Sequence, residues 1–242
     1  MTSTNRALAH LIRSRRRNAR MLELFSGTGS VGNVFREKGW DVLSLDRDMP
    51  ADIRSDIMDW DYQTYRPGDF YFVWASPPCT EYSKAKTVGV RKIAEANKVV
   101  ERTLEIIAYL RPVYYVIENP QTGYLKVQTF MQELPYKDVD YCKYGMPYRK
   151  RTRLWNNVAC WIPRPLCMKD CAQMLENRHR QTAQNRPRPN YSEDIRIPTR
   201  ELYKIPQQLV DEIEEALANN FENRPPQTED GVGAAAGVRA EA

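Results

Sequence analysis

A cysteine directly follows two prolines in residues 76–83, SPPCTEYS, where an apolar run ends. Prolines fix the backbone and remove N–H donors, so this turn holds Cys79 beyond the strand instead of inside it. A thiolate is the best side-chain nucleophile at neutral pH. The pattern predicts either a nucleophile presented at a strand end or a strand-end cysteine with no chemical role.

A carboxylate follows another apolar run in residues 116–120, VIENP. A carboxylate in this position costs free energy unless it is paired or used in chemistry. Glu118 is therefore a candidate catalytic residue. The alternative is a cap of the turn, since Asn119-Pro120 is typical of turns.

A glycine-rich turn follows a third run in residues 22–32, LELFSGTGSVG. Gly27 and Gly29 allow the backbone to turn tightly and to approach a ligand. The next strand ends in Asp46, whose carboxylate could hydrogen-bond a ribose diol. Together they predict a cofactor that carries adenosine, although the full dinucleotide fingerprint is not matched and a structural turn would look similar.

Asp56 and Ile57 follow a little further along the chain. Beside an adenine, Asp56 would accept a hydrogen bond from the amino group and Ile57 would pack on the ring face. The alternative for Asp56 is an N-cap or a turn residue.

Strand and helix patterns alternate along the chain and position these residues. Apolar, β-branched and aromatic runs predict strands at residues 19–25, 40–46, 70–76 and 112–120. Helical periodicity predicts helices at residues 30–39, 91–111 and 205–221. The alternation predicts an α/β fold, doubly wound, with a mostly parallel sheet and helices on both faces. Ligands bind beyond the carboxyl ends of such strands, where all these candidates fall.

The chain has 242 residues, of which 42% are hydrophobic, enough for one packed domain. No apolar run is long enough to cross a membrane, and the first residues lack a secretory signal. Five cysteines, an odd number, argue against a disulfide framework. We expect an intracellular protein with reduced cysteines, in the cytoplasm of a prokaryote or of a virus-infected host.

The net charge of +5 is compatible with a nucleic-acid partner. Basic residues cluster in two segments, Arg13, Arg15, Arg16, Arg17 and Arg20, and Lys143, Arg149, Lys150, Arg151 and Arg153. The alternative for each cluster is a solvated face, or a flexible arm for the first.

Composition divides the chain into five expected parts. They are a basic arm at 1–19, a core of alternating strands and helices at 20–159, a short irregular insert at 160–199, a C-terminal helix at 200–222, and a disordered tail at 223–242.

The insert contains three cysteines and a histidine, Cys160, Cys167, Cys171 and His179. These four could bind zinc as a Cys₃His site. The alternative, equally open, is three ordinary cysteines and a surface histidine. Four nearby arginines would suit phosphate contact, Arg178, Arg180, Arg186 and Arg188.

The chain resembles the DNA (cytosine-5)-methyltransferase family, because five motifs occur in the family's order. Residues 22–32 resemble its cofactor loop, 76–83 its proline-cysteine motif, 116–120 its Glu-Asn motif, 144–155 its arginine motif and 202–217 its final helix. The resemblance implies a Rossmann-like fold and S-adenosylmethionine as cofactor. It implies a cofactor site of Phe25, Ser26, Gly27, Thr28, Gly29, Asp46, Asp56, Ile57 and Pro77. It also implies that residues 20–159 are the catalytic core, that the insert at 160–199 is a much shortened target-recognition region, and that the helix at 200–222 returns to the core.

The resemblance also implies a mechanism on a cytosine flipped out of DNA. Cys79 would attack carbon 6, Glu118 would hydrogen-bond ring nitrogen 3, and carbon 5 would take the methyl group. Arg151 is the third catalytic candidate, and with Arg153 it would hold the base and the phosphates. A gap-free alignment puts Lys150 at the first arginine position instead.

Three other readings stay open. The first is an amino methyltransferase acting on cytosine N4 or adenine N6, whose similar turn carries an aromatic residue where Cys79 stands; Tyr82 is three positions later. The second is an RNA cytosine-5 methyltransferase, and the third an inactive nucleic-acid-binding relative. We expect a monomer that acts on double-stranded DNA, with RNA not excluded. The small size suits a viral or prokaryotic modification enzyme, as in restriction–modification systems.

Overall fold

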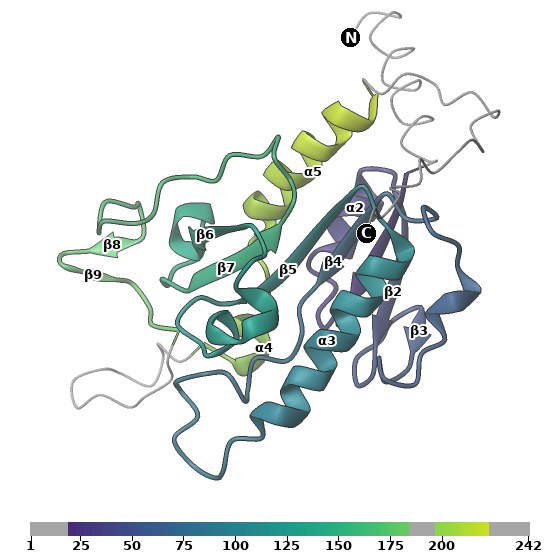
Figure 1. Cartoon of the computed structure of the whole chain (residues 1–242). Helices are drawn as coiled ribbons and strands as arrows, with labels where there is room; N and C mark the ends of the chain where they lie inside the picture. The colour runs from purple at the N-terminus through teal and green to yellow at the C-terminus, as the bar shows by residue number, and fades with distance from the viewer. Residues whose placement is uncertain (1–18, 184–196, 223–242) are drawn as a thin grey trace, which may run out of the picture.

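The computed structural model describes residues 19–183 and 197–222, and within them seven strands form one sheet (Figure 1). The order across the sheet is β3-β2-β1-β4-β5-β7-β6. The strands are β1 Arg20–Leu24, β2 Asp41–Asp46, β3 Ile53–Arg54, β4 Phe72–Ala75, β5 Tyr114–Pro120, β6 Tyr136–Asp140 and β7 Arg151–Asn156. The first five are parallel, whereas β7 runs antiparallel to both β5 and β6.

Four α-helices accompany the sheet among the described residues: α2 Gly32–Glu37, α3 Ile93–Leu110, α4 Thr199–Leu202 and α5 Gln207–Glu222. Short 3₁₀ turns connect the remaining elements: η1 Tyr62–Thr64, η2 Leu125–Val127, η3 Thr129–Met131 and η4 Tyr141–Tyr144. No helix among the described residues has both the length and the apolar character that a membrane crossing needs.

The side chains of each strand alternate between two hydrophobic cores, one on each face of the sheet. On one face, α2 and α5 cover Met21, Phe72 and Val116. On the other face, α3 covers Leu22, Val73 and Ile117. The doubly wound α/β fold predicted from the sequence is confirmed.

The predicted elements agree with the structure to within a few residues at each end. Gly39 has a positive φ of 93° directly after α2, which is the helix stop that the sequence indicated. The antiparallel pair β6 and β7 was not predicted. On α3 the buried face includes Val100 and Ile107, whereas Ala108 is exposed.

The insert is attached to the sheet but is not part of it. Its two short strands, β8 Met174–Leu175 and β9 Arg178–His179, pair only with each other (Figure 1). The predicted arm at 1–19, apart from Ala19, and the predicted tail at 223–242 lie outside the described residues, as does the part of the insert at 184–196.

The C-terminal segment returns to the start of the fold. The Ile205 N–H donates to Ser30 Oγ at 3.0 Å, just before α2. Trp40 Nε1 donates to Glu214 Oε1 of α5 at 2.8 Å, and Lys38 pairs with the same carboxylate at 3.0 Å. The final helix therefore packs beside the glycine-rich turn.

Candidate active site

The candidate residues gather where the strand order reverses, between β1 and β4. The chain leaves β1 toward β2 on one side and leaves β4 toward β5 on the other, so loops diverge at this point. In an open parallel sheet, this divergence forms the ligand crevice. The glycine-rich turn follows β1, and the proline-cysteine turn follows β4.

The turn that carries Cys79 is locked from both sides. The buried Asn119 side chain of β5 donates from Nδ2 to the Pro77 carbonyl at 2.9 Å. After the cysteine, the Tyr82 and Ser83 N–H groups both donate to the Cys79 carbonyl, at 3.1 and 2.8 Å. The Glu-Asn motif thus fixes the proline-cysteine motif directly.

The Cys79 thiol is partly exposed and lies within electrostatic reach of Glu118 and Lys150. Burial raises the pKa of Cys79, and the negative charge of Glu118 raises it further, whereas the positive charge of Lys150 lowers it. The nucleophile candidate and the carboxylate candidate, 39 positions apart in the sequence numbering (118 minus 79), therefore share one site.

Glu118 is 6% exposed and has two partners at the same oxygen. The Tyr141 hydroxyl donates to Oε1 at 3.1 Å, and Lys150 Nζ lies 3.6 Å from it. Burial and the charge of Glu118 raise the pKa of Tyr141 well above its usual value, so the phenol keeps the proton that it donates. Both contacts leave Oε2 for a ligand.

The glycine-rich turn has three residues in the left-handed region, Phe25, Gly27 and Gly29, with φ of 58°, 53° and 69°. A phenylalanine there is strained, and such strain concentrates at functional sites. The Gly27 N–H donates to Asp46 Oδ2 at 2.8 Å, so the turn is bound to the end of β2.

The same turn contains an orphaned polar atom. The Ser26 main chain is paired with Leu45 and Gly29, but its buried hydroxyl has no partner among the described residues. Thr28 Oγ1, in contrast, donates to Ser30 Oγ at 3.3 Å. Buried polar groups are normally satisfied, so an unpaired hydroxyl beside Asp46 suits a polar ligand such as a nucleoside cofactor.

Comparison with known proteins decides the family. No family model matches the chain. The chain is 37% identical over 174 residues to a protein of Frog virus 3 (isolate Goorha) described as "Probable DNA (cytosine-5)-methyltransferase". The match covers 65% of this chain and 80% of the viral protein. The chain belongs to the DNA (cytosine-5)-methyltransferase family.

Two solved structures are also similar, at a level that carries no argument. A DNMT2 mutant of Spodoptera frugiperda is 17% identical, with a TM-score of 0.40, over 61% of this chain and 55% of that one. The Dnmt2 methyltransferase of S. pombe is 14% identical, with a TM-score of 0.39, over 56% of this chain and 48% of that one. The chain thus spans about half the length of these two proteins.

The arginine motif of this cytosine-5 methyltransferase is arranged differently from the sequence prediction. Glu118 lies directly opposite Leu154 in the ladder between β5 and β7, so both side chains are on one face. Alternation then places Lys150 on the face of Glu118 and Arg151 on the other face. Arg151 pairs with Asp140 at 2.8 Å, whereas Lys150, which the gap-free alignment puts at the first arginine position, lies beside Glu118.

The rest of the basic cluster is also paired within the protein. Lys143 pairs with Asp170, Arg149 with Asp140 and Arg153 with Asp138, at 2.8, 3.2 and 2.8 Å. The Arg153 guanidinium in addition lies 3.5 Å from the centre of the Tyr136 ring. These side chains are therefore neither a simple solvated face nor an unpaired phosphate-binding patch.

Asp56 and Ile57 have partners inside the protein. Asp56 Oδ1 accepts the Met58 N–H at 3.0 Å, which is the turn role that the sequence left open. Its Oδ2 pairs with Arg47 at 3.1 Å. Ile57 is 3% exposed and packs in the core on the α3 side.

Tyr82 is completely buried, and its hydroxyl donates to Asn97 Oδ1 of α3 at 2.8 Å. An aromatic residue that stacks on a flipped base must be exposed to the site. The amino-methyltransferase reading therefore loses the side chain on which it depended.

The zinc hypothesis was incomplete, and one residue of the site was missed. The zinc hypothesis included Cys160, but Cys160 is exposed and its thiol reaches only the Ala216 carbonyl, at 3.7 Å. Cys142 joins Cys167, Cys171 and His179 instead.

Tyr141, one position earlier, was missed because its role depends on β6, and no pattern in the sequence indicated that strand.

A second carboxylate, Glu23, lies buried in β1 below the glycine-rich turn. Burial raises its pKa to about 7, although the charge of Arg36 and the N–H groups of Val31 and Gly32 oppose the shift. A Cβ at Gly32 would lie 2.3 Å from its Oε2, so a larger residue at the start of α2 would force the Glu23 carboxylate to shift.

Proposed function

We propose that the protein transfers a methyl group from S-adenosylmethionine to carbon 5 of cytosine in DNA, through a covalent Cys79 adduct on a flipped-out base. The observation that carries the proposal is the placement of Cys79 in the turn after β4 and of Glu118 near the carboxyl end of the adjacent parallel strand β5. The bond from Asn119 to the Pro77 carbonyl fixes their relative position. Membership of the cytosine-5 methyltransferase family supports the same reaction.

Cys79 begins the reaction by adding its sulfur to carbon 6 of the cytosine. The thiol must first lose its proton, and its raised pKa opposes this. Lys150 favours the thiolate by its charge, and a bound base that withdraws the negative charge of Glu118 would favour it further. Bond formation moves an electron pair into the ring and makes carbon 5 nucleophilic.

Glu118 would bind the cytosine ring. Its Oε2 would contact ring nitrogen 3 while Tyr141 and Lys150 hold Oε1. A proton shared between Glu118 and nitrogen 3 neutralises the charge that develops there. We assign Lys150 and Tyr141 as the residues that orient Glu118, and we keep Arg151 as a candidate that holds the base and the phosphates.

The cofactor would lie at the glycine-rich turn, held by residues 25–29 and Asp46. S-adenosylmethionine supplies the methyl group when bound. The unpaired Ser26 hydroxyl and the Asp46 carboxylate offer polar contacts. The buried Pro77, two residues before Cys79, would line the same site. Asp56 and Ile57 remain predicted adenine neighbours, although their present partners would have to rearrange. A base then removes the carbon 5 proton, and elimination frees Cys79.

The substrate is a nucleic acid, and we keep double-stranded DNA as the proposed form. A cytosine inside a duplex hides carbon 6, so the base must be flipped out. The insert would contact the target, and Arg178 and Arg180 are exposed there. The division of the chain into arm, core, insert, helix and tail, action as a monomer and an intracellular location belong to the same proposal.

The test is mass spectrometry of modified nucleosides in DNA and RNA. A host without methylases expresses the chain or its Cys79→Ala variant. We expect 5-methylcytosine in DNA with the unchanged chain and none with the variant. Cys160→Ser is the matched control, because that thiol is exposed and distant in role, and it should keep the mark.

Other outcomes would overturn parts of the proposal. 5-Methylcytosine in RNA alone would keep the mechanism and replace the substrate. N4-methylcytosine or N6-methyladenine would replace the mechanism. No mark in either pool, with folded protein present, would favour an inactive nucleic-acid-binding relative.

A further inference from the structure

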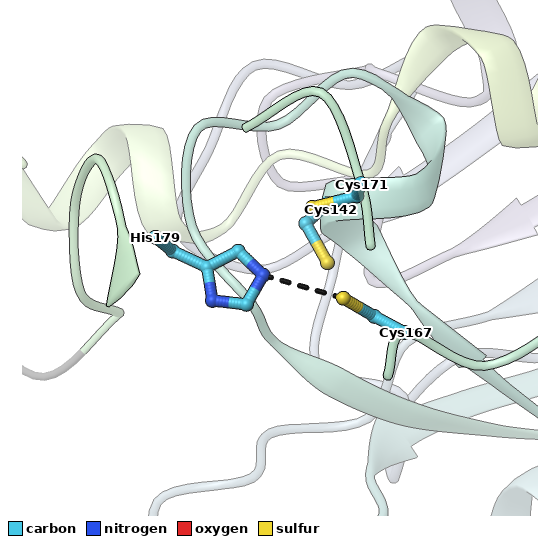
Figure 2. A group of neighbouring side chains, drawn as sticks. All are labelled: Cys142, Cys167, Cys171 and His179. Carbon is cyan, nitrogen blue, oxygen red and sulfur yellow. Dashed lines mark hydrogen bonds between the residues drawn. The ribbon is translucent and has the colours of Figure 1, made fainter. Parts of the chain in front are cut away.

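Three cysteines and a histidine converge at the junction of the core and the insert. They are Cys142, Cys167, Cys171 and His179, and Figure 2 shows their side chains pointing toward a common centre. Their ligand atoms all lie within 4.8 Å of one another, and Cys167 Sγ is 3.4 Å from His179 Nε2. We propose that they bind one structural zinc ion, which fastens the insert to the catalytic core.

The distances suit a tetrahedral ion. Zinc bonds of about 2.3 Å to sulfur and 2.0 Å to nitrogen place ligand atoms roughly 3.5–3.8 Å apart in a tetrahedron. The Cys167 to His179 distance already has this length, and the remaining atoms need only a small contraction. Four protein ligands leave no open position, which is typical of structural sites and not of catalytic ones.

The loop from Cys167 to Cys171 has the local form of a metal-binding turn. Three residues separate the two cysteines, within the usual ligand spacing. The N–H groups of Lys169 and Asp170 hydrogen-bond the Cys167 sulfur, and Lys169 has a positive φ of 68°. The Asp170 carboxylate in turn accepts the Met168 N–H at 3.0 Å. The backbone is thus folded around the sulfur.

The described part of the insert has little apolar packing of its own. Its hairpin has two residues in each strand, and so short a hairpin is not stable alone. Its large apolar side chains Ile162, Met168 and Leu175 are 85%, 81% and 65% exposed. A segment without a core of its own needs another constraint, and a metal is one that small domains use.

The four ligands come from three separate pieces of chain. Cys142 belongs to η4, beside the sheet, whereas Cys167 and Cys171 flank a loop and His179 ends β9. One ion would therefore join core, loop and hairpin. The same junction contains the bond from the Cys167 N–H to Asp140 Oδ2, at 3.0 Å.

Lys143 complements the charge of the proposed site. Three thiolates and one zinc ion carry a net charge of −1, and Lys143 is within electrostatic reach of Cys167 and Cys171. It is also paired with Asp170 in the loop. A buried cluster of thiols has no comparable need for a cation.

Metal analysis of the purified full chain tests the proposal. The chain is produced with zinc in the medium, purified without chelator and measured by mass spectrometry of metals. We expect one zinc ion per chain, and at least a tenfold loss of zinc in Cys142→Ser and in His179→Gln. Cys160→Ser is the matched control and should keep its zinc. A zinc-free unchanged chain, or loss of zinc in Cys160→Ser alone, overturns the proposal.

A second measurement does not depend on whether the variants fold. The unchanged chain is loaded with Co²⁺ in place of zinc, and X-ray absorption counts its ligands. Three sulfur neighbours and one nitrogen are expected, whereas a shell of oxygen and nitrogen overturns the site. Titration of thiols in the denatured chain should find all five cysteines reduced; a disulfide among the three cluster cysteines also overturns it. The proposal does not rest on the proposed methyl transfer, because Cys79→Ala should lose activity and keep its zinc.

Discussion

The sheet end that carries Cys79 and Glu118 and the insert that ends in β9 are held in different ways. The sheet end inherits its geometry from strand ladders and two cores, and even its turns are bound to neighbouring strands. The insert has one isolated hairpin and a few bonds to the core, such as the Gln181 N–H to the Pro147 carbonyl at 3.0 Å. The proposed catalytic residues thus lie on the sheet, which is held by many contacts. The proposed target recognition lies on the insert, which has few contacts and which the proposed zinc ion would stabilise.

The largest effect should come from Glu118→Gln at the rigid end. The amide cannot share a proton with ring nitrogen 3, so methyl transfer should fall by about 10²–10⁴-fold. Tyr141 can still donate to the amide oxygen, so the fold should be kept. Rates of methyl transfer from labelled cofactor, together with circular dichroism, check this. A fall below about tenfold would mean that the sheet end does not supply the chemistry.

Glu23→Gln should show how much the buried Glu23 carboxyl group lowers the stability of the folded chain as the pH rises. The pKa of Glu23 is 4.5 in the unfolded chain and about 7 in the folded one. Below pH 4.5 both states are protonated, and between these values only the unfolded chain ionises. Stability therefore falls with rising pH across this window, by up to about 3 kcal/mol, and the loss is complete above it.

The variant should remove this dependence and be more stable at pH 8 by up to about 3 kcal/mol. Urea unfolding at several pH values measures it. Glu37→Gln on the exposed side of α2 is the control and should change stability by less than about 0.5 kcal/mol. Parallel pH profiles for Glu23→Gln and the unchanged chain would contradict the assignment of the buried proton.

Lys150→Met and Arg151→Met should show which face of the chain at β7 affects Cys79. Without the Lys150 cation the pKa of Cys79 rises, so less thiolate is present at neutral pH and the reaction of Cys79 with iodoacetamide should slow by about tenfold. The rising limb of its pH profile should move to higher pH. Arg151→Met is the control, since Arg151 lies on the opposite face. Peptide-resolved mass spectrometry measures Cys79 alone, and an equal effect of both variants would favour the original prediction for Arg151.

The smallest effect should come from Cys160→Ser at the edge of the insert. This exposed thiol has one weak contact, so unfolding free energy should change by less than about 0.5 kcal/mol. Cys142→Ser should instead make the insert more susceptible to limited proteolysis, because the core and the hairpin lose their common ligand. Equal cleavage of the two variants would remove the contrast between fastened insert and rigid core.

The core was predictable from the sequence because its patterns are local. A buried parallel strand is a short apolar run, and Cys79, Glu118 and the glycine turn each follow one immediately. The sheet then brings these ends together, so order along the chain was sufficient to place them. The helix predicted at 205–221 follows the same rule, since Leu209, Ile213 and Leu217 recur at helical spacing and are all completely buried in α5.

The remaining residues depend on contacts that no local pattern contains. β6 has the sequence YKDVD, in which three of five residues are charged, and it is a strand because Asp138 and Asp140 pair with arginines of β7. Without that strand, neither Tyr141 nor the face of Lys150 could be assigned. Cys142 was missed because it precedes the insert and belongs to the core, whereas the zinc hypothesis considered only cysteines within the insert.

Cys79 follows β4, and Glu118 lies near the end of the adjacent strand β5. Their relative position depends on the ladder between these two strands and on the bond from Asn119 to the Pro77 carbonyl, and both belong to the core. Insertions or deletions in the insert therefore leave this geometry unchanged. Evolution could therefore replace the segment that selects the target many times without moving the side chains that carry out the reaction.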